Sequence, residues 1–277
     1  MNRPILTVPV QKVEGVSSVP FQDLLAVEEP LEIRLHHDQD DRSISITMRT
    51  PGHDFELAAG FLFSEGILHH ASQVREIRWS HLANGNQRQL GNSVTVELNP
   101  GVDVDLDRLE RHFYTTSSCG VCGKASIEAI EMQDCPVLPR NGPMVEGSVI
   151  HLLPDALRRA QPVFERTGGL HAAALFSPQG EFQLLREDVG RHNAVDKLIG
   201  AEMLAGHTPL GERLMFVSSR ASFELVQKAL MAGIPILAAV GAPSSLAVET
   251  AQRFNLTLLG FVRDSRFNIY SGASRIQ

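Results

Sequence analysis

RLMFVSSRASFELVQKALMAGIPILAAV, residues 213–240, is the stretch of sequence that decides the fold class. RLMFVSS and IPILAAV read as strands, and ASFELVQKALMAG between them reads as a helix. The apolar run ILAAV (236–240) is typical of a strand that is buried on both faces, as in a parallel or mixed sheet covered by helices. The stretch therefore predicts an α/β architecture.

The same alternation continues on both sides of this stretch. The further segments that read as strands are GLHAAALF (169–176), EFQLLRED (181–188) and NLTLLGFV (255–262). Those that read as helices are HNAVDKLIGAEML (192–204) and SSLAVETAQRF (244–254). We expect these elements to form one α/β domain over residues 116–277.

The N-terminal part follows a different pattern. LEIRLHH (31–37) and SISITMR (43–49) predict a half-buried hairpin, because apolar and polar residues alternate in the second run. A helix with Asp54 as its cap follows, and then strands at VREIRWS (74–80) and SVTVELNP (93–100). We expect a smaller α+β domain over residues 1–115, whose first dozen residues form a loose lead-in.

Composition narrows the classes of protein to consider. The chain has 277 residues, of which 43% are hydrophobic, and a formal net charge of −7. An acidic chain is a poor general nucleic-acid binder, because that affinity rests on basic surface. No apolar run is long enough to span a bilayer, the first residues show no export signal, and the three cysteines are an odd number. We therefore expect a cytoplasmic protein that binds neither nucleic acid nor membrane.

The segment SSCGVCGK (117–124) holds two of the three cysteines, Cys119 and Cys122. A structural zinc site needs four ligands, and no second pair of this spacing is present. A zinc deaminase needs an H-x-E motif, which the chain lacks. Thiol–disulfide exchange is open, although a thioredoxin-type pair sits at the end of a strand near the start of a small domain and this pair lies mid-chain in a Gly/Ser loop. No metal ligand set is predicted.

A persulfide relay is the fourth interpretation of this pair. Such a relay needs an accessible thiol on a mobile tether, and small polar residues and glycines surround both cysteines. Lys124 adds a positive charge that favours the thiolate of Cys119. The plain alternative is a small-residue turn with incidental thiols.

Two strand-to-helix junctions resemble anion sites. FVSSRASFE places Ser218, Ser219 and Arg220 after a strand, and AAVGAPSSLAVE places Ser244 in the same context. Helix N-termini with free N–H groups suit phosphate, and ligands of α/β sheets gather beyond the carboxyl ends of the strands. Ordinary serine caps are the alternative. REDVGRHNAVDK (186–197) adds charged residues at a third strand-to-helix junction, which is typical of a functional loop or of a solvated helix start.

Several segments together resemble one known family. SSCGVCGK, GGLHAAAL, REDVGRHNAVDK, SSRASFE, GAPSSLA and GFVRDSRFNIY are similar to the FdhD/NarQ family of formate dehydrogenase accessory sulfur carriers. The resemblance implies a C-terminal three-layer α/β domain like that of cytidine deaminases, without the zinc chemistry. It also implies a cytoplasmic homodimer.

The resemblance further implies a reaction. A cysteine desulfurase would supply sulfur as a persulfide, and the acceptor would be the molybdenum or tungsten bis(guanine dinucleotide) cofactor of formate dehydrogenase. Cys119 would carry the sulfur as a persulfide, and Cys122 would assist the transfer or resolve the persulfide. GDP would stand in for half of the cofactor. The implied cofactor-binding residues are Phe261, Val262, Arg263, Asp264, Ser265 and Arg266. A cofactor-binding chaperone with structural or zinc-bound thiols is the alternative.

Overall fold

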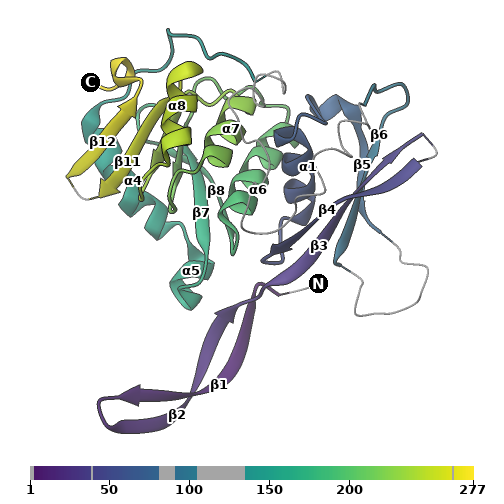
Figure 1. Ribbon diagram of the computed structural model, residues 1–277. Helices are drawn as coiled ribbons and strands as arrows, with labels where there is room; N and C mark the ends of the chain where they lie inside the picture. Colours follow the sequence, from purple (N-terminus) through teal and green to yellow (C-terminus); the bar gives the residue numbers. More distant parts are fainter. Residues whose placement is uncertain (1–2, 39, 81–90, 105–134, 264) are drawn as a thin grey trace.

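Figure 1 shows the computed structural model, which describes residues 3–38, 40–80, 91–104, 135–263 and 265–277. The chain forms a six-stranded sheet, a four-stranded sheet and a two-stranded hairpin. Cys119, Cys122 and Asp264 lie outside the described residues, and so does the predicted domain boundary at residues 115 and 116. What the sequence predicts for these residues stays a prediction.

The six-stranded sheet is mixed, as predicted, and its strand order is β12-β11-β10-β9-β7-β8. Its strands are β7 (His171–Phe176), β8 (Phe182–Asp188), β9 (Leu214–Val217), β10 (Ile236–Ala239), β11 (Thr257–Arg263) and β12 (Arg266–Ser271). β9, β10 and β11 are parallel to one another, so their carboxyl ends meet at one edge of the sheet. β7, β8 and β12 run antiparallel to their neighbours.

Helices cover both faces of this sheet, which makes three layers (Figure 1). On one face α4 (Gly147–Arg159) packs against the side chains of Ala172, Ala174 and Phe216. On the other face lie α6 (Arg191–Leu204), α7 (Phe223–Met231) and α8 (Ser245–Arg253). Successive side chains of a strand alternate between the two faces, so both are apolar and the central strands are fully buried. The α/β prediction is confirmed, while the likeness to cytidine deaminases stays a prediction.

The N-terminal part forms the four-stranded sheet, in the order β4-β3-β6-β5. Its strands are β3 (Glu29–His37), β4 (Asp40–Arg49), β5 (Val74–Trp79) and β6 (Ser93–Leu98), and the predicted hairpin is β3 with β4. Helix α1 (Asp54–Ser64) follows β4. The prediction that Asp54 caps this helix is wrong, because His53 is the N-cap residue. The Asp54 carboxylate instead accepts hydrogen bonds from Arg49 Nε (2.6 Å) and Gly52 N (3.1 Å).

A glycine-mediated helix crossing joins the two larger sheets. α1 packs on α6 so closely that a Cβ on Gly60 would collide with the carbonyl of Asp196, and a Cβ on Gly200 with that of Glu56. Only glycine permits backbones to approach at this distance. One hydrophobic cluster therefore contains side chains from both parts of the chain, among them Leu57 and Leu198.

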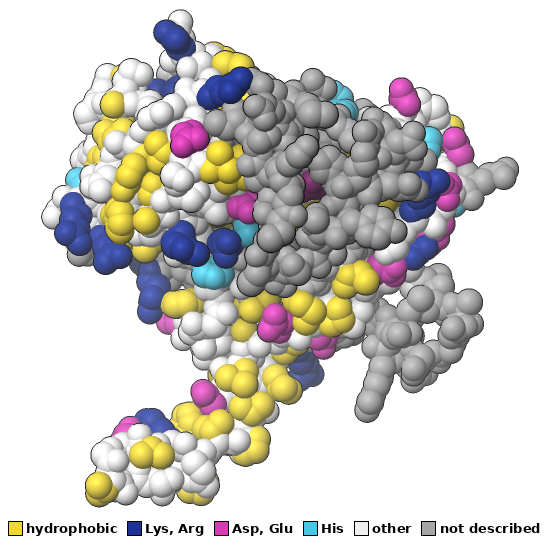
Figure 2. Space-filling view, in the orientation of Figure 1, with side chains coloured by type: hydrophobic (Ala, Val, Ile, Leu, Met, Phe, Trp, Pro, Cys, Tyr) yellow, Lys and Arg dark blue, Asp and Glu magenta, His cyan; other side chains and the backbone are white. Residues whose placement is uncertain are grey.

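The N-terminal residues form a projecting hairpin, β1 (Ile5–Glu14) with β2 (Ser17–Ala26), instead of the expected loose lead-in. The hairpin extends away from the body of the molecule (Figure 1). Leu6 pairs with Leu25 and Val10 with Phe21, and cross-strand partners lie on the same face of a ribbon. This face stays open to solvent: Leu6 is 57% exposed and Phe21 49%, and apolar side chains line the hairpin in Figure 2.

Candidate functional site

The predicted anion-binding loops meet at the carboxyl edge of the six-stranded sheet. The loop after β9 is hydrogen-bonded to the loop after β10, because Gly241 N donates to Ser219 O at 3.1 Å. That loop is bonded in turn to the end of β11, because Phe261 N donates to Gly241 O at 3.1 Å. A Cβ on Gly241 would crowd the backbone of Arg220. The structure thus brings the three predicted segments side by side.

The serine hydroxyls of these loops serve the fold. Ser218 Oγ accepts a hydrogen bond from Ala172 N at 2.9 Å, and Ser219 Oγ donates to Arg220 O at 3.0 Å. Ser244 is the N-cap of α8 and accepts from Ala247 N at 3.2 Å. These three serines therefore act as ordinary cap and turn residues, because each hydroxyl bonds to the protein backbone. Other side chains must supply the groups that could bind a ligand at this edge.

Arginines supply the charge at this edge. Arg220, Arg263 and Arg266 are all exposed, and Arg263 pairs with Arg266 across β11 and β12. The end of β11 is irregular, with a bulge between Gly260 and Arg263 and a positive φ of 53° at Phe261. Bulges commonly redirect side chains beside functional sites.

The predicted cofactor residues on either side of these arginines differ in exposure. The Phe261 side chain is 36% exposed, and Ser265 is exposed. Val262 is fully buried and packs in the cluster with α4, so its side chain belongs to the core.

A cavity of about 630 Å³, here called the edge cavity, opens beside the same loops. Ser218 and Val240 contribute its sheet side, where β9 and β10 end. The residues that line the rest come from α4, α5 (Pro162–Thr167) and the start of β7: Pro154, Asp155, Leu157, Arg158, Gln161, Phe164, Gly168, Gly169, Leu170 and His171. The cavity therefore combines an apolar wall with one carboxylate and one guanidinium.

Helix α5 is held over the edge cavity by a carboxylate from β8. Glu187 Oε1 accepts from Phe164 N at 2.8 Å, and Glu187 Oε2 accepts from Val163 N at 3.1 Å. Burial raises the pKa of Glu187, although these backbone hydrogen bonds act in the opposite direction. With α5 fixed in this way, the ring of Phe164 lies 4.8 Å below the guanidinium carbon of Arg158. Such a stacked pair presents a flat surface at the wall of the cavity.

Two histidines lie near this edge. Burial lowers the pKa of His171, the first residue of β7, and the positive charge of Arg191 lowers it further. Burial and the charges of Lys228 and Arg191 lower the pKa of His192 to about 4. The His192 imidazole is therefore neutral at pH 7, and its Nε2 lies 3.4 Å from Ser222 Oγ. His171 is half-buried and lines the edge cavity.

The motif REDVGRHNAVDK has a mainly structural role. Asp188 is fully buried and accepts hydrogen bonds from Thr50 N (3.1 Å), Gly190 N (2.8 Å) and Asn193 Nδ2 (3.1 Å). Lys197 Nζ completes its shell at 2.6 Å. These bonds tie the end of β4 to the start of α6, so the charges that suggested a functional loop bind the two parts of the chain together.

A second buried ion pair continues the same connection. Asp196 Oδ1 accepts from Lys228 Nζ at 2.8 Å and from Ser64 Oγ at 2.9 Å. α1, α6 and α7 are thereby joined at one point. Removing either partner of such a pair would leave an uncompensated buried charge, which is strongly destabilising.

The family model described as FdhD/NarQ family matches residues 26–277. The chain belongs to the FdhD/NarQ family. The FdhD/NarQ match begins where the hairpin ends, at Ala26, and spans both larger sheets.

Relatives in the FdhD/NarQ family cover nearly the whole chain. A protein of Streptomyces avermitilis named Sulfur carrier protein FdhD is 52% identical over 95% of this chain and 91% of its own length. A protein of Mycobacterium tuberculosis with the same name is 51% identical over 92% of each chain. The crystal structure of a putative formate dehydrogenase accessory protein from Desulfotalea psychrophila covers 99% of both chains with a TM-score of 0.73. At 23% identity, it supports the fold.

Other features of this FdhD/NarQ chain bear on the remaining expectations. Within the part of the chain that the structure describes, no helix is long and apolar enough to cross a membrane. The sequence did not point to Asp155, Arg158, Gln161 or Phe164, because no motif marks them. The sequence feature that could have located the α4 residues is the spacing of Ile150, Leu153 and Leu157, which predicts an amphipathic helix. Residues on the opposite side of such a helix are available to line a cavity.

Proposed function

We propose that this chain is a sulfur carrier for formate dehydrogenase, which accepts sulfur as a persulfide on Cys119 and delivers it to a guanine dinucleotide cofactor of molybdenum. The identity of 52% over 95% of the chain to a protein named Sulfur carrier protein FdhD carries this proposal. A cysteine desulfurase would be the donor. We place the reaction in the cytoplasm, because reduced thiols persist there. The homodimer is part of the proposal on the ground of the family resemblance alone.

The loading step follows ordinary persulfide chemistry. The Cys119 thiolate attacks the terminal sulfur of the donor's Cys–S–SH, the donor's S–S bond breaks, and its electron pair leaves with the donor thiolate. Cys119 then carries S–SH. In delivery, either the sulfur moves as a neutral atom and the acceptor supplies two electrons, or the Cys122 thiolate attacks Cys119 Sγ. The second route releases hydrosulfide and leaves a disulfide that a reductant must reopen.

Intact-mass measurement after incubation with a cysteine desulfurase and cysteine tests the loading step. We expect the wild type to gain the mass of one sulfur atom and Cys119→Ala to gain none. Cys135 offers a matched control, because it is buried and lies 3.3 Å from Met231 Sδ. Cys135→Ala should therefore load like the wild type. An unmodified wild type, or a sulfur that persists in Cys119→Ala, would refute the assignment; stoichiometric zinc in the purified protein would favour the chaperone alternative.

The carboxyl edge supports the second half of the proposal, the binding of the client cofactor. Arg220, Arg263 and Arg266 give an exposed cationic rim for phosphates, and guanidinium groups match phosphate oxygens well. The edge cavity beside them has room for a base and the means to recognise guanine. The Asp155 carboxylate can accept from two guanine N–H groups, and the Arg158–Phe164 stack offers a flat face. The cofactor is the substrate of delivery in this scheme.

Calorimetric titration with GDP tests this placement. We expect Arg263→Ala to weaken GDP binding about tenfold or more, because charge-assisted hydrogen bonds contribute about 1.5–3 kcal/mol. Asp155→Asn should weaken GDP binding while leaving pyrophosphate binding unaffected, since in this placement the carboxylate would contact only the base. Arg159→Ala, an exposed residue of α4 outside the cavity lining, is the control. Unchanged GDP affinity in both Arg263→Ala and Asp155→Asn would show that the site lies elsewhere.

A further inference from the structure

A second cavity lies at the opposite edge of the six-stranded sheet, and nothing in the proposed sulfur transfer uses it. β12 is antiparallel to β11, so its last residue, Ser271, lies where the parallel strands begin. The cavity measures about 490 Å³. Its lining comes from α8, the second residue after that helix, the end of β12, the C-terminal turn and the bend at residue 140: Arg140, Gln252, Asn255, Ile269, Tyr270, Ser271, Gly272, Ala273, Ser274 and Arg275.

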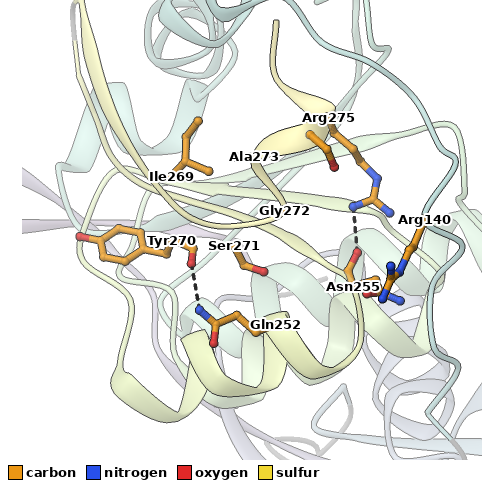
Figure 3. A pocket seen from close by; sticks show the side chains of 10 residues that line it. Arg140, Gln252, Asn255, Ile269, Tyr270, Ser271, Gly272, Ala273 and Arg275 are labelled. Carbon is orange, nitrogen blue, oxygen red and sulfur yellow. Dashed lines mark hydrogen bonds between the residues drawn. The ribbon is translucent and has the colours of Figure 1, made fainter.

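The charge of this lining is one-sided. Two guanidinium groups, those of Arg140 and Arg275, face this cavity, and among the described residues no carboxylate lines its wall. Figure 3 shows Arg140, Arg275 and Asn255 on the same side of the cavity, with both guanidinium groups directed toward Asn255. Two like charges held in one cavity repel each other, and an anion between them would remove that cost.

Arg275 is an unusual residue for its burial. It is only 3% exposed, and its Nη1 donates to Asn255 O at 2.8 Å and to Thr257 Oγ1 at 3.1 Å. Its Nη2 donates to Pro139 O at 2.6 Å. All three acceptors are neutral, and Nε has no hydrogen-bond partner within the part of the chain that the structure describes. These bonds fix the guanidinium firmly in place, and none of the described residues that bind it carries a negative charge.

The same bonds bring Arg140 to the cavity. Pro139 is held by Arg275, so the next residue follows at the cavity rim, where its side chain is exposed. A Cβ on Gly142 would lie 3.2 Å from Arg275 Nε, so this bend wraps the buried guanidinium. Burial lowers the pKa of Arg275. An anion at the rim would therefore meet the exposed cation of Arg140 and the field of the fixed cation of Arg275.

We propose that this cavity binds an oxyanion, the phosphate group of a small molecule, between Arg140 and Arg275. A phosphate carries up to two negative charges, which two guanidinium groups can balance. The hydroxyl groups of Ser271 and Ser274 also line the cavity and can donate to the remaining oxygens. The cavity is much larger than one phosphate, so the group belongs to a larger molecule, for which orthophosphate and pyrophosphate are minimal probes.

The test must exclude phosphate binding at the carboxyl edge. We would therefore replace the exposed Arg220 and Arg263 with Gln and measure the Tm of this double variant against phosphate concentration, at constant ionic strength set with chloride. A ligand of the folded state raises Tm in a saturable way. We expect a saturable rise with phosphate and pyrophosphate and none with acetate.

Adding Arg140→Gln to this background should weaken the phosphate effect about tenfold or more, because one charge-assisted contact is lost. Arg140 is exposed, so the variant should fold like its parent. Arg159→Gln, added in its place, is the matched control and should leave the effect unchanged. A flat phosphate response in the background variant, an unaltered response with Arg140→Gln, or a loss with Arg159→Gln would each overturn the proposal. None of these outcomes depends on sulfur transfer or on GDP.

Discussion

At the scale of single residues, the molecule depends on charged side chains that are buried and paired. Arg49 is fully buried and is held by Asp54, and Asp188 receives four donors. Glu56 of α1 accepts from Arg186 of β8, with Arg186 Nη2 at 2.8 Å from Oε1. Each of these pairs either joins the N-terminal part of the chain to the C-terminal part or fixes the first residues of α1. The loss of one partner should therefore weaken the packing of the two parts against each other.

Glu56 gives this dependence a pH signature. Burial by itself would raise the pKa of Glu56, but hydrogen bonds from Arg186 and His53 lower it from 4.5 to about 2. A carboxylate with a lowered pKa stabilises the fold above pH 4.5, and this contribution disappears as the pH falls toward 2. We expect the Tm of the wild type to fall more steeply between these two pH values than that of Glu56→Gln, each measured relative to its own value at pH 7.

Glu165, an exposed residue of α5, provides the control for this titration. Glu165→Gln should keep the acid limb of the wild-type curve. Parallel acid limbs for the wild type and Glu56→Gln would show that this ion pair contributes nothing to acid stability.

Individual elements differ in how far the sequence predicts them. The apolar runs of β9, β10 and β11 predicted these strands, because burial on both faces leaves an uninterrupted hydrophobic signal. α4 carries Pro154 inside it and a polar outer face, so its signal is weaker. The hairpin strands mix apolar and polar residues without strict alternation, so their sequence does not distinguish a strand pair from a loose terminus.

The candidate site could be predicted only in part, and for a physical reason. Sequence patterns report strand ends, so Ser218, Ser219 and Arg220 were found at the carboxyl edge. The opposite wall of the edge cavity comes from α4 and α5, whose residues meet β9 and β10 only after folding. A resemblance to relatives supplied Phe261 to Arg266, which periodicity alone does not mark.

The crossing of α1 and α6 leads to a prediction at the element scale. Gly→Ala in a helix normally stabilises it by about 1 kcal/mol. At Gly200 the added methyl would collide with the carbonyl of Glu56, so we expect Gly200→Ala to destabilise the protein by about 2 kcal/mol or more. Chemical denaturation followed by circular dichroism would measure the free energy of unfolding. Gly211→Ala, where a Cβ would have no neighbour within 4 Å, should be close to neutral, and equal stabilities of the two variants would contradict the close crossing.

At the scale of the whole molecule, the hairpin stands apart from the two larger sheets. β2 contacts α5 at the base of the hairpin, and the family model begins only at residue 26. A two-stranded ribbon is marginally stable in water by itself. The hairpin should therefore contribute little to the stability of the body.

Deletion of residues 3–25 tests this independence. We expect the Tm of the shortened protein to stay within a few degrees of the wild type, because no buried cluster loses a member from the hairpin. Calorimetry of both proteins is the measurement. A drop of more than about 10 °C would mean that the hairpin is an integral part of the core.

The glycine crossing of α1 and α6 has a consequence for synthesis on the ribosome. Gly60 leaves the exit tunnel about 140 residues before Gly200, the partner that covers it. At translation speeds of about 5–20 residues per second, roughly 7–28 s pass before α6 is synthesised. During this time the face of α1 that packs on α6 in the folded protein is exposed to solvent. A trigger-factor-like holdase that shields apolar segments during this interval should raise the yield of native protein, and slower codons before residue 200 should lower it.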